Sequence, residues 1–78
     1  MNTKPPTGTV LTFKFFRKPN GRLQATCQEL GITKPVESQD GRRYKFLKVF
    51  QMYYWFSEED VWRLQLAEEG DVIKVKVV

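Results

Sequence analysis

The sequence predicts a small, mainly β domain with one short helix, and three observations lead to this prediction. Residues 9–27 alternate apolar and polar side chains on either side of a Pro-Asn-Gly turn sequence at 19–21. Residues 42–56 form a long strand-like run after the turn signal Asp-Gly at 40–41. Ser57 then precedes three acidic residues, which is typical of a helix N-terminus.

The turn at 19–21 determines the register of the first hairpin. Pro at the first position, Asn at the second and Gly at a left-handed third are typical of a type I turn closed by a glycine bulge. This three-residue loop pairs Lys18 with Arg22, Phe16 with Gln24, Phe15 with Ala25, Lys14 with Thr26 and Phe13 with Cys27. A two-residue Asn-Gly turn would set Phe15 opposite Thr26 and mix apolar with polar side chains. We therefore predict the bulged loop.

The predicted register gives the hairpin two different faces. The apolar face consists of Leu11, Phe13, Phe15, Leu23, Ala25 and Cys27. The opposite face consists of Lys14, Phe16, Lys18, Arg22, Gln24 and Thr26. Phe16 is the one large apolar residue among these cations, which favours an anionic ligand with stackable rings. The alternative for Phe16 is a second small core or a dimer contact.

Two further strand regions follow the hairpin. We predict a short strand at residues 32–36. It should lie at an edge of the sheet, because Pro35 excludes a central position. The run 42–56 is long for one straight strand. We expect either a strongly coiled strand that serves two sides of a barrel or a break near Gln51.

The C-terminal third predicts a helix and a final strand. Ser57 as N-cap predicts a helix from Glu58 to about Leu64, followed by Leu66 filling the core. The alternative is an all-β meander with a strand at 61–67, where apolar and polar residues also alternate. In the last strand, 72–78, the inward side chains are Ile73, Val75 and Val77 and the outward ones are Lys74 and Lys76.

These elements predict one domain and a short arm. Residues 1–8 contain two prolines and small polar residues, and we expect a flexible N-terminal arm. Residues 9–78 then form a single five-stranded OB- or SH3-like barrel with one short helix. A chain of 78 residues buries only about 60% of its unfolded surface, so its stability margin should be thin.

Charge is distributed unevenly along the chain. Residues 1–50 hold ten Lys and Arg against three Asp and Glu, whereas residues 51–78 hold three against six. We expect a polyanion to bind the first part.

The residues needed for catalysis or metal binding are missing. The chain has no His, and its single Cys27 lies at an apolar position without an activating partner. The acidic residues cluster in two runs, 58–60 and 68–71, which a helix start and a turn explain. We predict no enzymatic activity, no metal and no cofactor. With no membrane-spanning run and no signal-peptide pattern, we expect a cytoplasmic protein.

Basic and aromatic residues on neighbouring strands predict binding of single-stranded DNA or RNA. The candidate residues are Lys14, Phe16, Lys18, Arg22, Arg42, Arg43, Lys45, Tyr53 and Trp55. For Tyr53 and Trp55 the alternative is packing against the helix, and for Arg42 and Arg43 it is a solvated loop. The rival function is a small protein-binding regulator or assembly subunit, including a viral or plasmid-borne inhibitor, that uses the same face. The small size of the domain and the rings on its outer face also favour a homodimer.

Overall fold

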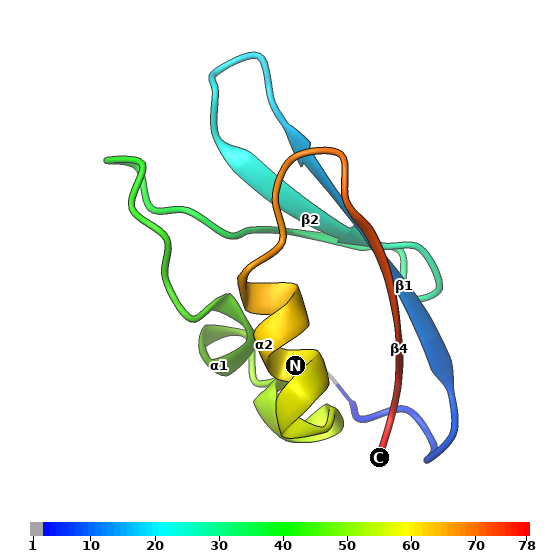
Figure 1. Cartoon of the computed structure of the whole chain (residues 1–78). Helices are drawn as coiled ribbons and strands as arrows, with labels where there is room; N and C mark the ends of the chain where they lie inside the picture. Colours follow the sequence, from blue (N-terminus) through cyan, green and yellow to red (C-terminus); the bar gives the residue numbers. More distant parts are fainter. Residues whose placement is uncertain (1–2) are drawn as a thin grey trace.

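The structure, a computed structural model, describes residues 3–78 as a four-stranded antiparallel sheet with helices on one face (Figure 1). The strands are β1 (Val10–Arg17), β2 (Leu23–Cys27), β3 (Ile32–Pro35) and β4 (Val72–Lys76). Their order across the sheet is β3-β2-β1-β4, so β4 returns from the end of the chain to pair with β1. Between β3 and β4 lie α1 (Phe46–Val49), the 3-10 helix η1 (Tyr53–Trp55) and α2 (Glu58–Gln65).

The β1–β2 hairpin has the predicted register. Phe15 lies opposite Ala25 and Phe13 opposite Cys27, as the bulged three-residue loop requires. The loop is closed by the Lys18 N–H, which donates to the Arg22 carbonyl at 3.0 Å, and Gly21 has a φ of 85°. The six side chains of the predicted apolar face are all buried. The hairpin register is therefore confirmed.

The core lies between the sheet and the helical layer. The Phe13 ring contacts Phe56 edge-on with centroids 6.0 Å apart, and Phe15 contacts Phe46 in the same way at 6.4 Å. Val75 of β4 is also buried, and Lys74 and Lys76 are exposed as predicted. The inward rings of β1 thus pack against aromatic rings from the segment between β3 and β4, and the buried residues of β2 and β4 belong to the same core.

The prediction of a long strand over 42–56 is wrong. Only Arg43 forms an isolated antiparallel bridge, to Glu37, and the chain then forms α1 and η1. Adjacent residues are buried in pairs here, Phe46 with Leu47 and Trp55 with Phe56. A strand places neighbours on opposite faces, whereas helical turns can bury both. The chain does change direction at Gln51, where φ is 62°, but it does so after a helical turn.

The sheet is open rather than closed. β3 and β4 form its two edges, and residues 3–78 contain no fifth strand. The five-stranded OB- or SH3-like barrel is therefore not confirmed, because the segment expected to close it forms the helical layer instead. The short edge strand around 32–36 is confirmed as β3.

The helix after Ser57 is confirmed, and the alternative strand at 61–67 is wrong. The Ser57 hydroxyl oxygen accepts a hydrogen bond from the Asp60 N–H at 3.3 Å, as expected of an N-cap. Val61 and Leu64 are buried beneath the helix. Leu66 does not fill the core, because it is 67% exposed and the buried residue is its neighbour Ala67.

The predicted arm at 1–8 lies partly outside the described residues. Within the described part, the Gly8 N–H donates to the Val77 carbonyl and the Val77 N–H donates to the Thr9 carbonyl, both at 2.8 Å. These bonds continue the β1–β4 pairing, so Gly8 already leads into the sheet.

Candidate nucleic-acid interface

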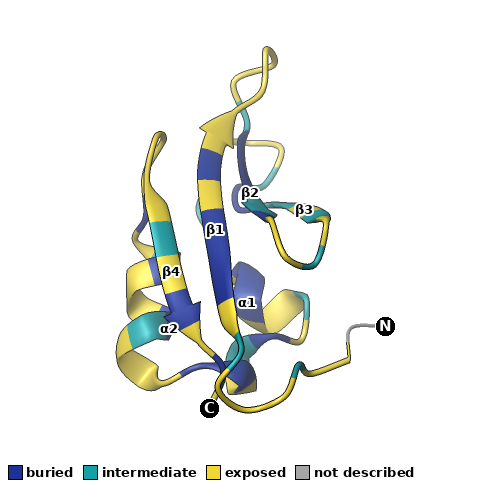
Figure 2. Cartoon of the chain, turned by 90° about the vertical axis from the view of Figure 1, so that its right-hand side faces the viewer, coloured by how far each residue is buried: buried dark blue, intermediate teal, exposed yellow. Residues whose placement is uncertain are grey.

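The outer face of the sheet is the face opposite the helices, and no helix covers it (Figure 2). Lys14 and Phe16 of β1 lie on this face, next to the hairpin turn that holds Lys18. Phe16 is 39% exposed, unlike the buried Phe13 and Phe15 on the other face. The hairpin therefore presents the basic and aromatic surface that its register predicts.

β4 extends this basic surface beyond the hairpin. In the β1–β4 register, Lys14 lies opposite Val72, Thr12 opposite Lys74 and Val10 opposite Lys76. Directly opposed residues share a face, so Lys74 and Lys76 lie on the same side of the sheet as Lys14. Neither lysine was among the sequence candidates. Their outward direction was predicted from alternation, but the sequence did not show that β4 lies beside β1.

One carboxylate lies on this face beside the lysines. Glu29 accepts hydrogen bonds from the Thr12 N–H at 2.6 Å and from the Thr12 hydroxyl at 2.8 Å. These bonds hold the pKa of Glu29 below its ordinary value, and the positive charge of Lys74 acts in the same direction. Glu29 thus supports β1 and reduces, without cancelling, the positive charge contributed by Lys14, Lys74 and Lys76.

Arginines and lysines have different roles in this fold. All five ion pairs found in residues 3–78 use an arginine, with Arg17, Arg42, Arg43 and Arg63 as the cations. The lysines of the outer face take part in none of them. These lysines therefore keep their positive charge available to an external anion.

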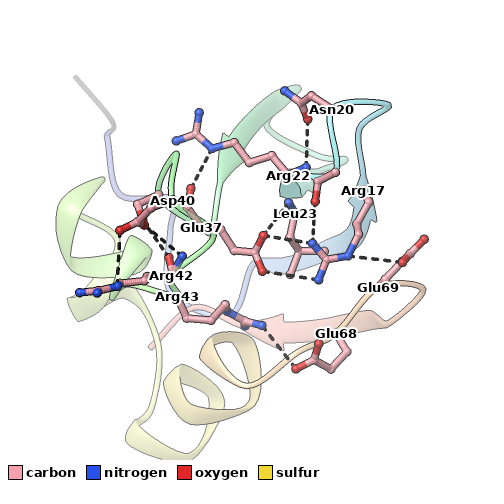
Figure 3. Close-up of polar contacts among 12 residues, drawn as sticks. Arg17, Asn20, Arg22, Leu23, Glu37, Asp40, Arg42, Arg43, Glu68 and Glu69 are labelled. Atoms are coloured by element: carbon pink, nitrogen blue, oxygen red, sulfur yellow. Dashed lines mark hydrogen bonds and ion pairs between the residues drawn. The ribbon is translucent and has the colours of Figure 1, made fainter.

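Arg22 contributes to the fold at the turn end of the hairpin (Figure 3). Its Nε donates to the Glu37 carbonyl at 2.8 Å. The Glu37 carboxylate accepts from Arg17 Nη1 at 3.0 Å and from the Leu23 N–H at 3.1 Å, and these donors lower the pKa of Glu37. Arg22 is half-buried, so it lies at the margin of the candidate surface rather than in its centre.

Arg42, Arg43 and Lys45 lie on the segment that leads to α1, away from the outer sheet face. Arg42 pairs with Asp40 at 3.4 Å (Figure 3). Arg43 Nη2 donates to the Gln65 carbonyl at 2.6 Å, and Arg43 Nη1 pairs with Glu68 at 3.5 Å. These arginines hold loops together. Of the three, only Lys45 is exposed without an ion pair among the described residues.

Tyr53 and Trp55 lie in η1, within the helical layer. Trp55 is 4% exposed, and its carbonyl accepts from the Val78 N–H at 2.8 Å. Tyr53 is half-buried and contacts the Tyr54 ring. Because Trp55 is buried, its ring cannot stack on a nucleobase, so Trp55 is not part of the candidate surface. It packs in the helical layer, as the alternative expected.

The structure thus divides the candidates into two groups. Lys14, Phe16 and Lys18 lie together on the hairpin, where Lys74 and Lys76 join Lys14 and Phe16 on the outer sheet face. The remaining candidates lie at the hairpin margin or in the helical layer. The lysine–Phe16 surface is the name used below for these five residues: Lys14, Phe16, Lys18, Lys74 and Lys76.

No helix in residues 3–78 is long and apolar enough to cross a membrane. Within the same residues, no three Cys, Asp or Glu side chains gather as metal ligands would. Comparisons of the chain with protein-family models, with curated proteins and with solved structures found no match.

Proposed function

We propose that this chain is a non-catalytic protein that binds single-stranded DNA or RNA through the lysine–Phe16 surface. The observation that carries the proposal is the partly exposed Phe16 ring on a sheet face that no helix covers, with Lys14 next to it on β1 and Lys18 at the adjoining turn. Lys74 and Lys76 lie farther along the same face, opposite Thr12 and Val10. An open sheet is sufficient for this function, since bases can stack on an exposed ring without a closed barrel.

The physical basis is stacking combined with charge. Stacking of a base on an aromatic side chain contributes on the order of 1–3 kcal/mol. Lysine side chains on the same face neutralise phosphates and release counterions, which makes binding depend on salt. Both contributions require only a sheet face that presents the ring and the cations together. Neither depends on base identity, so the proposal is binding without strong sequence preference.

A titration of fluorescent oligo-dT at several salt concentrations tests the proposal. Each neutralised phosphate contributes roughly −0.7 to the slope of log affinity against log salt for single strands. Replacing Lys14 and Lys74 together with Ala should weaken binding and flatten the slope by about 1.4. The matched control replaces Lys45 and Lys48, which also removes two exposed charges but lies in the helical layer. Equal effects of the two pairs, or no binding at low salt, would contradict the proposal.

A protein partner is the second candidate function, and the apolar residues of the same face favour it. Val10 is 45% exposed and Val72 is 58% exposed, and both lie on the face that carries Phe16. A patch of this kind with a basic rim suits an acidic protein surface. This function would be favoured if the chain does not bind oligo-dT at low salt and if Phe16→Ala causes a loss of dimers or complexes.

A further inference from the structure

The hydrogen-bonding direction of β4 can be derived from the bonds at its two ends. The Phe15 N–H donates to the Asp71 carbonyl at 3.0 Å, and the Val77 N–H donates to the Thr9 carbonyl at 2.8 Å. Asp71 and Val77 flank β4, and both have odd residue numbers. In an antiparallel pair such residues alternate with residues whose backbone groups point away. The backbone groups of Val72, Lys74 and Lys76 therefore point away from β1, toward the open edge of the sheet.

This edge differs from the other edge of the sheet. β3 is short and contains Pro35, which cannot donate a hydrogen bond, and it is followed by a segment that bridges back to Arg43. β4 has five residues and no proline. It is the edge that could accept a further strand along its length.

The helical layer lies on the inner side of this edge. Figure 2 shows α2 behind β4 and extending past the free side of the strand. The exposed apolar side chains at the end of this helix are Trp62, 54% exposed, and Leu66, 67% exposed. They lie one helical turn apart, so they share a side of the helix. An added strand would bring alternate side chains toward α2 and would direct the others toward the outer face.

We propose that the β4 edge binds an extended peptide in which acidic and apolar residues alternate. The acidic side chains would lie beside Lys74 and Lys76 on the outer face, and the apolar ones would face the helical layer. A second copy of the same edge is a poor occupant, because it would bring two more lysines onto the same face. This inference does not depend on nucleic-acid binding, because it rests on the free backbone groups of β4 and on the charges of its two lysines, and it does not involve Phe16.

The test uses a blocked peptide of about six residues in which glutamate alternates with valine. Val72→Pro removes one N–H at the free edge, keeps all lysines and changes a residue that is 58% exposed. Proline at the first residue of an edge strand is compatible with the fold. Val72→Thr is the matched control, since it is β-branched and keeps the N–H. Circular dichroism and a thermal melt verify that both variants remain folded.

We expect the peptide to bind wild type and Val72→Thr, and Val72→Pro to bind roughly five- to tenfold more weakly, as one lost hydrogen bond predicts. Lys74→Glu should also weaken binding, and a peptide with lysine in place of glutamate should not bind. Oligo-dT affinity should be unchanged by Val72→Pro, which separates this proposal from the proposed function. Absence of peptide binding to the wild type, or equal binding to both proline and threonine variants, would overturn the proposal.

Discussion

Arg17 and Glu37 join the end of β1 to the segment after β3, with Arg17 Nη1 donating to Glu37 Oε1 at 3.0 Å. The same Glu37 oxygen accepts from the backbone of Leu23, the first residue of β2. Arg17 also contacts Glu69 in the turn before β4, at 3.5 Å. One guanidinium and one carboxylate thus connect four segments of the chain at the turn end of the hairpin.

The first prediction concerns Glu37 and pH. Arg17 and the Leu23 N–H lower the pKa of Glu37 in the folded protein, so the unfolded state takes up a proton first as pH falls. The stabilisation is fully present above the unfolded pKa of about 4.3 and is lost as pH falls through the lower folded value. Glu37→Gln should therefore lower the free energy of unfolding at pH 7, and the difference from wild type should shrink below about pH 4.

Urea denaturation of both proteins at pH 7 and at about pH 3.5 measures this difference. Glu69→Gln is the control, because it removes a more exposed partner of the same Arg17 and should change little. A difference between wild type and Glu37→Gln that stays constant with pH would contradict the prediction.

The second prediction concerns Gly21. Its φ of 85° is a conformation that β-branched residues rarely adopt, and a Cβ added there would meet no atom within 4 Å. The cost of Gly21→Val is therefore conformational, and we expect a loss of about 1 kcal/mol or more. Gly21→Asn should cost less, because Asn tolerates the left-handed region. Urea denaturation measures both, and an equal cost for the two variants would contradict the explanation.

The third prediction separates Phe16 from Phe13, which lie on opposite faces of β1. Phe13 is 2% exposed, so Phe13→Ala should cost about 3–5 kcal/mol. Phe16→Ala should cost much less and should weaken oligo-dT binding, whereas Phe16→Trp should retain it. Thermal melts, light scattering and oligonucleotide titrations of the variants measure these effects. A large destabilisation by Phe16→Ala with unchanged oligonucleotide affinity would exclude Phe16 from the binding site.

The fourth prediction contrasts the two tryptophans. Trp55 is 4% exposed within the core, and Trp62 is 54% exposed on α2. Trp55→Ala should cost about 3–5 kcal/mol, whereas Trp62→Ala should change stability by about 0.5 kcal/mol or less. Fluorescence-monitored denaturation of each variant reads the remaining tryptophan. The reverse order of the two costs would show that the chain packs differently.

The fifth prediction concerns the thiol of Cys27. Burial on the inner face of β2 raises the pKa of this thiol, which reduces the thiolate at neutral pH. Modification by an aromatic disulfide reagent should therefore be slow in the native protein and rapid in urea. Thr26→Cys in a Cys27→Ala background provides the control, since residue 26 is on the outer face. Rapid native modification of Cys27 itself would show that the inner face opens readily.

The sequence by itself determined those elements whose signals are local. The Pro-Asn-Gly turn set the register of Phe15 against Ala25, because a one-residue slip would exchange the two faces of the hairpin. Ser57 and the following acids set the start of α2, since a cap acts within one helical turn. Alternation after Val72 likewise set the directions of Lys74 and Lys76.

Tertiary structure decided what depends on partners distant in sequence. Residues 42–56 have apolar side chains at both parities, and the choice of helical turns followed from burying Phe46 and Trp55 against the sheet. The pairing of β4 with β1 placed Lys74 and Lys76 on the same sheet face as Lys14, which no local pattern contains. Arg43 was likewise assigned to a loop by Glu68, which is distant in sequence and folds next to it. Burial and ion pairing depend on which segments meet, and strand order is settled only when the whole core packs.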